Sequence, residues 1–317
     1  MTVESDMRKE SEYIIILCGE FNDKYIPLTR SAFWEIYHKY GDSIEALVNS
    51  EEEKITELLK RSASVSFKIE ELARQGFHIT TFLDDDFPKK LLEKLNKDGK
   101  DFCPPLLYTC GNSALNRKRM VGYVGSRTVN EDDILWTEKR VDKNIRDGYG
   151  IVTGGAKGID STALIYAIEH GGNAVVFLPD NIKEKVREPF YQKNILNGKL
   201  VLYSQVSPLA AKSRNSFVAA AMERNKFIYA QSVGTVVVHT DLEKGGTWAG
   251  AKEALNPKHR WSIVYTWDHK GYPGNQKLIS MGAAGLSDDG ALIKPEEKQQ
   301  SVNIGQMSLF DMMPTAM

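Results

Sequence analysis

Two short apolar stretches of this 317-residue chain each run directly into a glycine turn that carries one cation. They are VGYVGSR (residues 121–127) and IVTGGAKGID (residues 151–160). A strand that ends at glycine and leads into a helix exposes unpaired backbone N–H groups at the positive end of that helix, which favours an anion site. With Arg127 in one turn and Lys157 in the other, the pattern predicts a ligand with more than one phosphate. That ligand is a dinucleotide, a small nucleotide or a nucleic-acid strand.

Beyond residue 76, apolar runs alternate with longer amphipathic stretches, which is typical of a parallel sheet with helices in its connections. We therefore expect an α/β fold with a doubly wound, Rossmann-like and mostly parallel sheet. Ligands of such sheets bind at the carboxyl ends of the strands, where both glycine turns lie. The predicted strands are 120–124, 150–153, 174–178, 200–203, 234–239 and 261–265.

Three segments differ in composition and in hydrophobic periodicity, and these differences predict the domain organisation. Residues 1–75 form a small helical module, with helical periodicity over 24–75 and Ser43 as a candidate N-cap. Residues 76–286 form the Rossmann-like core, and residues 287–317 are polar and aperiodic, as expected for a flexible, disordered tail.

The overall charge does not identify a nucleic-acid-binding protein, because the formal net charge is −1. Residues 181–230 nevertheless hold nine Lys or Arg against three Glu, a local +6 that fits a phosphate-facing surface or a solvated helix surface equally well. The three cysteines lack metal-ligand spacing, so we expect no metal and a reducing cytoplasm. The apolar run 14–18 is too short for a signal peptide or a membrane span, so no membrane association is expected.

Two enzymatic interpretations of the turns are disfavoured by missing residues. VTGGAKGID resembles a short-chain dehydrogenase, with Asp180 placed to bind a ribose, but Asp160 stands at the third glycine and no Tyr is followed four positions later by Lys. EKGGTWAGAKEAL (243–255) resembles the phosphate-binding turn of cytokinin-activating phosphoribohydrolases, yet their catalytic glutamate position is Gly250. No cofactor and no catalytic residue is therefore predicted, and the turn at 245–247 remains able to bind phosphate.

Four ordered motifs together resemble the DNA-processing protein A (DprA, also called Smf) family. They are VGSR (124–127), TGGAKGID (153–160), RNKFIYAQS (224–232) and KGGT (244–247), preceded by DDDFPKKLL and PPLLYTCGN. Taken alone, the third motif is typical of a helix N-terminal surface followed by a buried segment. The chain departs from the family where its Ala-Ala-His is Thr162-Ala163-Leu164, and we expect a short, divergent member.

The resemblance implies a non-catalytic protein that binds single-stranded DNA, loads a RecA-type recombinase and forms a homodimer. A sensor of a small nucleotide-derived ligand, using the same turns, is the alternative. Tyr123, Phe217 and Trp248 are candidates for base stacking, although each fits a core position equally well. The expected DNA or phosphate contacts are Gly125, Ser126, Arg127, Gly154, Gly155, Lys157, Gly158, Arg224, Asn225, Lys226, Gly245, Gly246 and Thr247.

A short motif interrupts the polar tail and suggests a further partner. Gln306, Met307, Ser308, Leu309 and Phe310 resemble the peptide by which bacterial DNA-metabolism proteins dock on the replication sliding clamp. Such a peptide becomes ordered on binding, when the Leu and Phe side chains fill a pocket. The biological setting, whether transformation, repair, antiviral defence or a mobile element, stays open.

Overall fold

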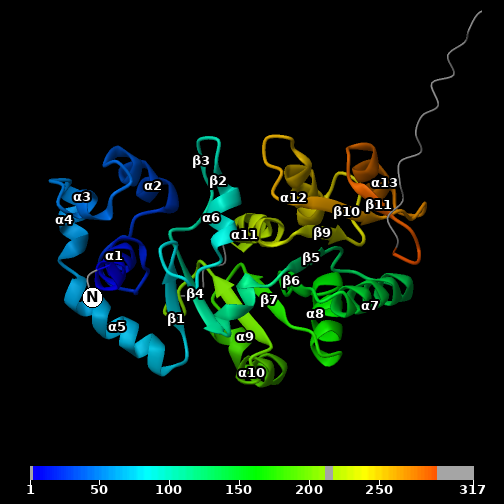
Figure 1. Ribbon diagram of the computed structural model, residues 1–317, viewed down its shortest axis with the longest axis horizontal. Coiled ribbons are helices and arrows are strands. Elements are labelled where there is room, and N and C mark those ends of the chain that lie inside the picture. Colours follow the sequence, from blue (N-terminus) through cyan, green and yellow to red (C-terminus); the bar gives the residue numbers. More distant parts are fainter. Residues whose placement is uncertain (1–2, 211–216, 291–317) are drawn as a thin grey trace, which may run out of the picture.

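A computed structural model describes residues 3–210 and 217–290, and these form a nine-stranded sheet with the order β1-β4-β8-β7-β6-β5-β9-β10-β11 (Figure 1). β4 runs opposite to its neighbours β1 and β8, whereas the other pairs are parallel. The predicted Rossmann-like, mostly parallel sheet is confirmed. The strands are β1 (His78–Thr81), β4 (Leu106–Gly111), β5 (Met120–Val124), β6 (Gly150–Thr153), β7 (Ala174–Leu178), β8 (Leu200–Ser204), β9 (Gly234–Val237), β10 (Ile263–Trp267) and β11 (Ala284–Leu286), with β2 (Asn96–Lys97) and β3 (Lys100–Asp101) forming a separate hairpin.

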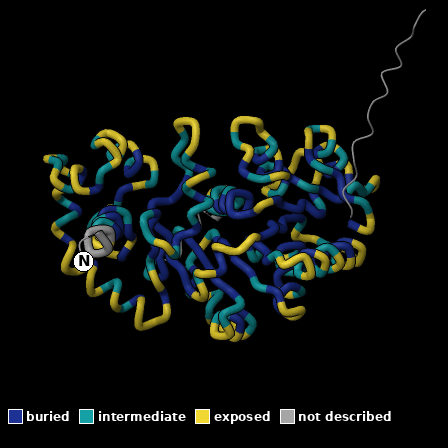
Figure 2. Tube along the Cα trace, in the orientation of Figure 1, coloured by how far each residue is buried: buried dark blue, intermediate teal, exposed yellow. Residues whose placement is uncertain are grey.

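Both faces of the sheet are covered, as the buried strands require. In β7, Val175 and Phe177 point into one hydrophobic core, while Ala174, Val176 and Leu178 point into the other. This alternation is the period of two of a strand, and burial of both sets explains why the sequence is continuously apolar there. Figure 2 shows the buried central layer with exposed loops around it.

The helices of the α/β core divide between the two faces. α6, α11 and α12 contribute to one hydrophobic core, and α7, α8 and α10 contribute to the other (Figure 1). Their bounds are α6 (Lys89–Leu95), the 3₁₀ turn η1 (Ser113–Arg117), α7 (Glu131–Arg146), α8 (Ile159–Glu169), α9 (Lys183–Arg187), α10 (Pro189–Leu196), α11 (Phe217–Gln231), α12 (Gly245–Leu255) and α13 (Pro273–Ser280).

The N-terminal helices pack directly on the β1 end of the sheet and share its hydrophobic cores. The Trp34 indole N–H, for example, donates to the backbone oxygen of Cys103 at 2.7 Å. Ser43 caps its helix as predicted. α1 was not predicted, and its apolar residues are buried in both cores. The bounds are α1 (Val3–Cys18), α2 (Arg30–Lys39), α3 (Ile44–Val48), α4 (Glu53–Leu59) and α5 (Ser62–Arg74).

β8 extends one residue beyond its predicted limit, to Ser204, and two further strands differ by more. β9 ends at Val237, and β10 begins at Ile263 rather than at residue 261. The register explains the second shift, because Ile263 pairs with Gly234, the first residue of the parallel neighbour. Trp261 is buried outside the sheet, where its ring stacks on His259 with centroids 4.6 Å apart.

The segment after β11 continues to contact the core. The Trp136 indole N–H donates to the backbone oxygen of Ser287 at 3.1 Å, and Arg140 donates to that of Gly290 at 3.1 Å. The folded part of the chain therefore extends at least to Gly290.

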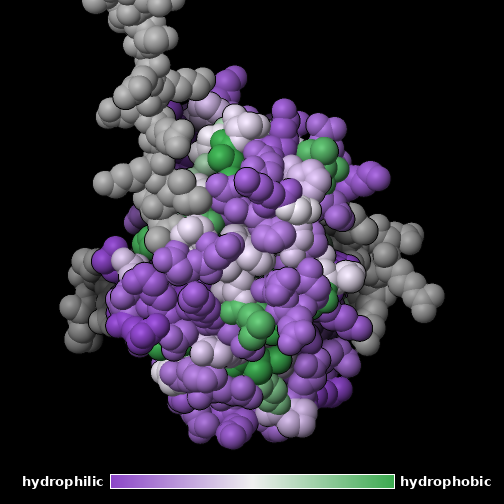
Figure 3. All heavy atoms as spheres, turned by 90° about the vertical axis from the view of Figure 1, so that its right-hand side faces the viewer, coloured by the Kyte–Doolittle hydropathy of each residue, from purple (hydrophilic) through white to green (hydrophobic). Residues whose placement is uncertain are grey.

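The end of the molecule that carries α7 and α13 presents mainly hydrophilic side chains, with a few small apolar areas (Figure 3). The predicted tail motif, 306–310, lies outside the described residues.

The strand order reverses at β5, which has β6 on one side and β9 on the other. From β5 the chain forms β6, β7 and β8 on one side and then crosses back to form β9 and β10 on the other, so a crevice opens at the carboxyl ends of β5 and β9. No helix in the described part of the chain is long and apolar enough to span a membrane.

Candidate functional site

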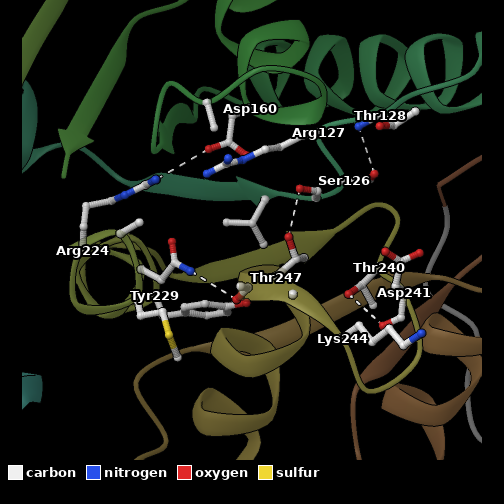
Figure 4. A pocket seen from close by; sticks show the side chains of 18 residues that line it. Ser126, Arg127, Thr128, Asp160, Arg224, Tyr229, Thr240, Asp241, Lys244 and Thr247 are labelled. Atoms are coloured by element: carbon white, nitrogen blue, oxygen red, sulfur yellow. Dashed lines mark hydrogen bonds and ion pairs between the residues drawn. The ribbon is translucent and has the colours of Figure 1, made fainter. Parts of the chain in front are cut away.

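A cleft of about 690 Å³ lies at this switch point, and a smaller pocket of about 250 Å³ adjoins it (Figure 4). The two cavities share Arg127, Ala156 and Arg224. Most of the predicted contact residues line one or the other. The cleft is lined by Gly125, Ser126, Arg127, Arg224, Asn225, Gly245, Gly246 and Thr247. The pocket is lined by Gly154, Gly155 and Lys157.

Two side-chain hydrogen bonds hold the walls of the cleft together. The Thr247 hydroxyl donates to the backbone oxygen of Gly125 at 2.9 Å, which joins the start of α12 to the turn after β5. The Asn225 amide donates to the backbone oxygen of Gly246 at 3.3 Å, which joins α11 to the same helix end. Thr247 and Asn225 therefore fix the shape of the cleft as well as lining it.

The first glycine turn does not lead into an open helix end, contrary to the sequence-based expectation. α7 begins only at Glu131, and its N-terminus carries a complete capping box. The Asn130 side chain accepts from the Asp133 N–H, and the Asp133 side chain accepts from the Asn130 N–H. Three acidic residues in this first turn also oppose the binding of an anion there.

The helices after the other two turns do have open N-termini. α8 begins after Gly158 and α12 after Lys244, and neither has a side-chain cap. Helix dipoles and N–H groups without a partner favour negative charge. The first N–H of α8, that of Ile159, already donates to the Ser126 backbone oxygen at 3.2 Å. Within the turn before α8, however, the Gly154 N–H donates to the Asp160 carboxylate at 3.0 Å. The α12 end is therefore the more open anion site of the two.

Arg224 is buried rather than placed on a helix N-terminal surface. It lies in the middle of α11, is only 5% exposed, and its Nη1 is 3.6 Å from Asp160 Oδ2. Burial lowers the pKa of Arg224 and raises that of Asp160, and the attraction between the two opposes both shifts. Figure 4 shows Arg127 and Arg224 approaching Asp160 from opposite sides. Arg224 therefore forms part of the floor of the cleft.

Two glycines of the second turn are required by this packing. A Cβ on Gly154 would lie 1.0 Å from Arg224 Nη1, inside the buried guanidinium. Gly158 has a positive φ of 81°, and a Cβ there would lie 2.2 Å from the Ser126 backbone oxygen. These glycines let the two turns and the buried arginine approach one another.

Lys226 and two of the stacking candidates lie away from the cleft lining. The Lys226 ammonium is 3.1 Å from Glu223 and 3.6 Å from Glu253, and it lies over the Phe102 ring. Tyr123 and Trp248 are core residues, exposed by 0% and 7%. The side chain of Phe217 lies outside the described residues.

The cations available to a ligand are Arg127, Lys157 and Lys244. All three are exposed, and no carboxylate in the described segments lies within ion-pair distance of them. Lys244 belongs to the KGGT motif but was not among the predicted site residues. Its position directly before an uncapped helix end was the available signal. The cleft residues that were missed are Val124, Thr128, Ala156, Asp160, Ala221, Met222, Tyr229, Thr240, Asp241 and Lys244.

Position 250 carries no catalytic side chain and packs closely against α11. A Cβ on the buried Gly250 would lie 3.3 Å from the Asn225 amide nitrogen and 3.5 Å from the Tyr229 ring. The described residues contain no group of three or more His, Cys, Asp or Glu placed to hold a metal ion.

Comparison with known proteins identifies close matches for most of this architecture. A family model described as DNA recombination-mediator protein A matches residues 78–295, more than half of the chain. A DNA processing protein DprA from Streptococcus pneumoniae (strain ATCC BAA-255 / R6) is 29% identical over 178 residues. That match covers 54% of this chain and 57% of the relative, so the chain spans little more than half the length of this curated protein.

Two solved structures share the fold. The X-ray structure of DprA from Streptococcus pneumoniae has a TM-score of 0.60 and 19% identity, covering 89% of this chain and 93% of that one. DprA from Helicobacter pylori, whose structure is described as giving insight into a unique single-stranded DNA binding mode, has a TM-score of 0.51 and 22% identity. It covers 65% of this chain and 90% of its own.

Proposed function

The chain belongs to the DNA recombination-mediator protein A family, and we propose that its cleft binds single-stranded DNA without catalysis. The observation that carries this proposal is the open α12 N-terminus, with exposed Lys244 and Arg127 on the same cleft and Lys157 on the adjoining pocket. Backbone N–H groups and unpaired cations at several points suit a chain of phosphates. Binding of this kind is salt-dependent and largely blind to sequence.

The predicted contact residues take two different roles in this proposal. Arg127, Lys157 and the turn at 245–247 contact phosphates, and we add Lys244 to this group. Arg224 and Gly154 shape the floor of the cleft through the buried pair with Asp160. Lys226 acts at most on a distant part of the strand, because Glu223 and Glu253 already neutralise it.

A sensor of a small nucleotide-derived ligand is the second candidate, since a cleft of about 690 Å³ is in the range of small-molecule sites. Fluorescence anisotropy with a labelled oligonucleotide and calorimetry with a mononucleotide separate the two. We expect oligonucleotide affinity that falls steeply as salt rises, and only weak mononucleotide binding. Saturable mononucleotide binding with no oligonucleotide affinity at moderate salt would favour the sensor.

Recombinase loading is the expected use of strand binding in this family. The test is a purified assay in which a RecA-type recombinase must displace a single-strand-binding protein from DNA. Faster filament formation in the presence of this protein is the expected result.

A homodimer in the cytoplasm is proposed from the same family resemblance. Leu135 of α7 and Ile165 of α8, which are 56% and 41% exposed, are candidates for its interface, and light scattering would reveal the dimer.

The segment 306–310 is proposed to bind the replication sliding clamp. Replacing Leu309 and Phe310 by alanine removes the two side chains expected to fill the clamp pocket, so clamp capture by the full chain should be lost. Replacing Met312 and Met313 by alanine is the matched control, because these apolar residues follow the motif. Equal capture by both variants, or none by the intact chain, would remove the clamp proposal.

A further inference from the structure

A second group of cations lies at the amino-terminal end of β5, whereas the cleft lies at its carboxyl end. We define the amino-edge patch as Lys90 and Lys94 of α6, Arg117 of η1, and Lys118 and Arg119 before β5. The last three are exposed and the two lysines of α6 are half-buried. None of the expected contact residues belongs to this patch.

Hydrogen bonds to backbone carbonyls hold these cations together. Lys90 Nζ donates to the Lys118 oxygen at 3.3 Å, and Lys94 Nζ donates to the Ser232 oxygen at 2.8 Å. Ser232 adjoins the same strand end, because the next N–H, that of Val233, donates to Met120 O at 2.9 Å. Arg117 donates to the Asp85 backbone oxygen at 3.1 Å. The positive charges are therefore positioned but not neutralised.

Within the described residues, no ion pair neutralises the cations of the patch. In the described parts of the chain, no carboxylate lies within ion-pair distance of its five cations, although Glu93 and Asp85 are nearby. Burial and then the charge of Lys90 lower the pKa of Lys94 to about 8. Burial also lowers the pKa of Lys90, where the attraction of Glu93 opposes the shift and the repulsion of Arg119 adds to it. A bound anion would reduce the electrostatic repulsion between these neighbouring cations.

An aromatic ring lies within the patch. The Arg119 guanidinium lies over the partly exposed Tyr149 ring, 4.8 Å from its centroid. Cations interleaved with an aromatic ring are the combination that single-stranded nucleic acids use, through phosphate contacts and base stacking.

We propose that the amino-edge patch is a second nucleic-acid contact, which binds phosphates of the strand outside the segment held in the cleft. This inference rests on the proposed function of the cleft. α11 connects the two surfaces: Arg224 lines the cleft, and Ser232, which accepts from Lys94, follows the end of the helix. Eight helical residues correspond to about 12 Å along the axis, so one strand can reach both surfaces.

The test compares a short oligonucleotide of about 6 nucleotides with a long one of about 30, measured by anisotropy across a salt series. The variant Lys118→Glu/Arg119→Glu reverses two exposed charges of the patch. Lys60→Glu/Arg74→Glu is the matched control, since it reverses two exposed cations of the N-terminal helices. Lys118→Gln/Arg119→Gln repeats the test with a smaller disturbance of charge.

The patch variant should bind the short oligonucleotide like the wild type but the long one at least about ten-fold more weakly, with a salt slope reduced by about 1.4 for two lost contacts. The control should lose less than about two-fold on either. Unchanged affinity of the patch variant for the long oligonucleotide would overturn the proposal. If the same variant lost binding to an acidic protein instead, the patch would be a protein-binding surface. Failure of the wild type to bind either oligonucleotide would instead refute the proposed function of the cleft.

Discussion

Replacing Asp160 by alanine is expected to reduce the free energy of unfolding by about 3–5 kcal/mol, because it leaves the Arg224 guanidinium buried without its partner. Both side chains are nearly inaccessible, at 6% and 7% exposure, so solvent cannot replace the lost interaction. The Gly154 N–H would also lose its acceptor. Urea unfolding followed by circular dichroism measures the effect.

A double-mutant cycle tests whether the loss arises from the unpaired charge. Asp160→Ala/Arg224→Met removes both charges and should be clearly more stable than the sum of the single changes predicts. Asp241→Ala is the control, since Asp241 is an exposed carboxylate of the same cleft and its removal should change stability by less than about 0.5 kcal/mol. Additive single-mutant effects would contradict the assignment of Arg224 and Asp160 as a coupled pair.

Replacing Arg61 by methionine should have an effect of similar size on the N-terminal helices, again about 3–5 kcal/mol. Arg61 is 1% exposed, and its guanidinium donates to the backbone oxygens of Ile16 at 2.8 Å and Gly19 at 2.9 Å. It also lies 3.4 Å from the Asp23 carboxylate. A methionine fills the space but leaves these carbonyls at the end of α1 without a donor. Thermal unfolding and hydrogen exchange of residues 3–75 measure the loss.

Arg74→Met provides the comparison for Arg61, because Arg74 is an exposed cation at the last residue of α5, the helix that Arg61 precedes as N-cap. Its replacement should alter the unfolding free energy by less than about 0.5 kcal/mol. Arg61→Lys should recover only part of the loss, since one ammonium cannot reproduce the planar fork of a guanidinium. Equal stability of the Arg61→Met and Arg74→Met proteins would refute this role of Arg61.

The fold was largely predictable because its signals are local. Buried parallel strands such as β7 are continuously apolar and end at turn residues, so their positions follow from the sequence. The capping box of α7 was also readable, since Asn130 and Asp133 have the required spacing. This capping box predicts a closed helix end after the first turn, in agreement with the structure.

The roles of individual cations were not predictable, because they depend on contacts between distant segments. Arg224 and Lys226 are two positions apart, yet one meets Asp160 inside the cleft floor and the other meets Glu223 and Glu253 outside it. Arg127 and Lys157 are exposed, and no acidic side chain of the described residues lies within ion-pair distance of them. A sequence motif gives residue types and order, but the pairing of charges is set by tertiary structure.

The salt dependence of oligonucleotide binding by Arg127→Ala/Lys157→Ala tests the central claim most directly. Each lost phosphate contact lowers the slope of log affinity against log salt by about 0.7 on single strands, so the double variant should lose about 1.4. Lys60→Ala/Arg74→Ala, which removes the same charge from exposed positions of the N-terminal helices, should keep the wild-type slope. A wild-type slope in the Arg127→Ala/Lys157→Ala protein, with its fold intact, would contradict strand binding in the cleft.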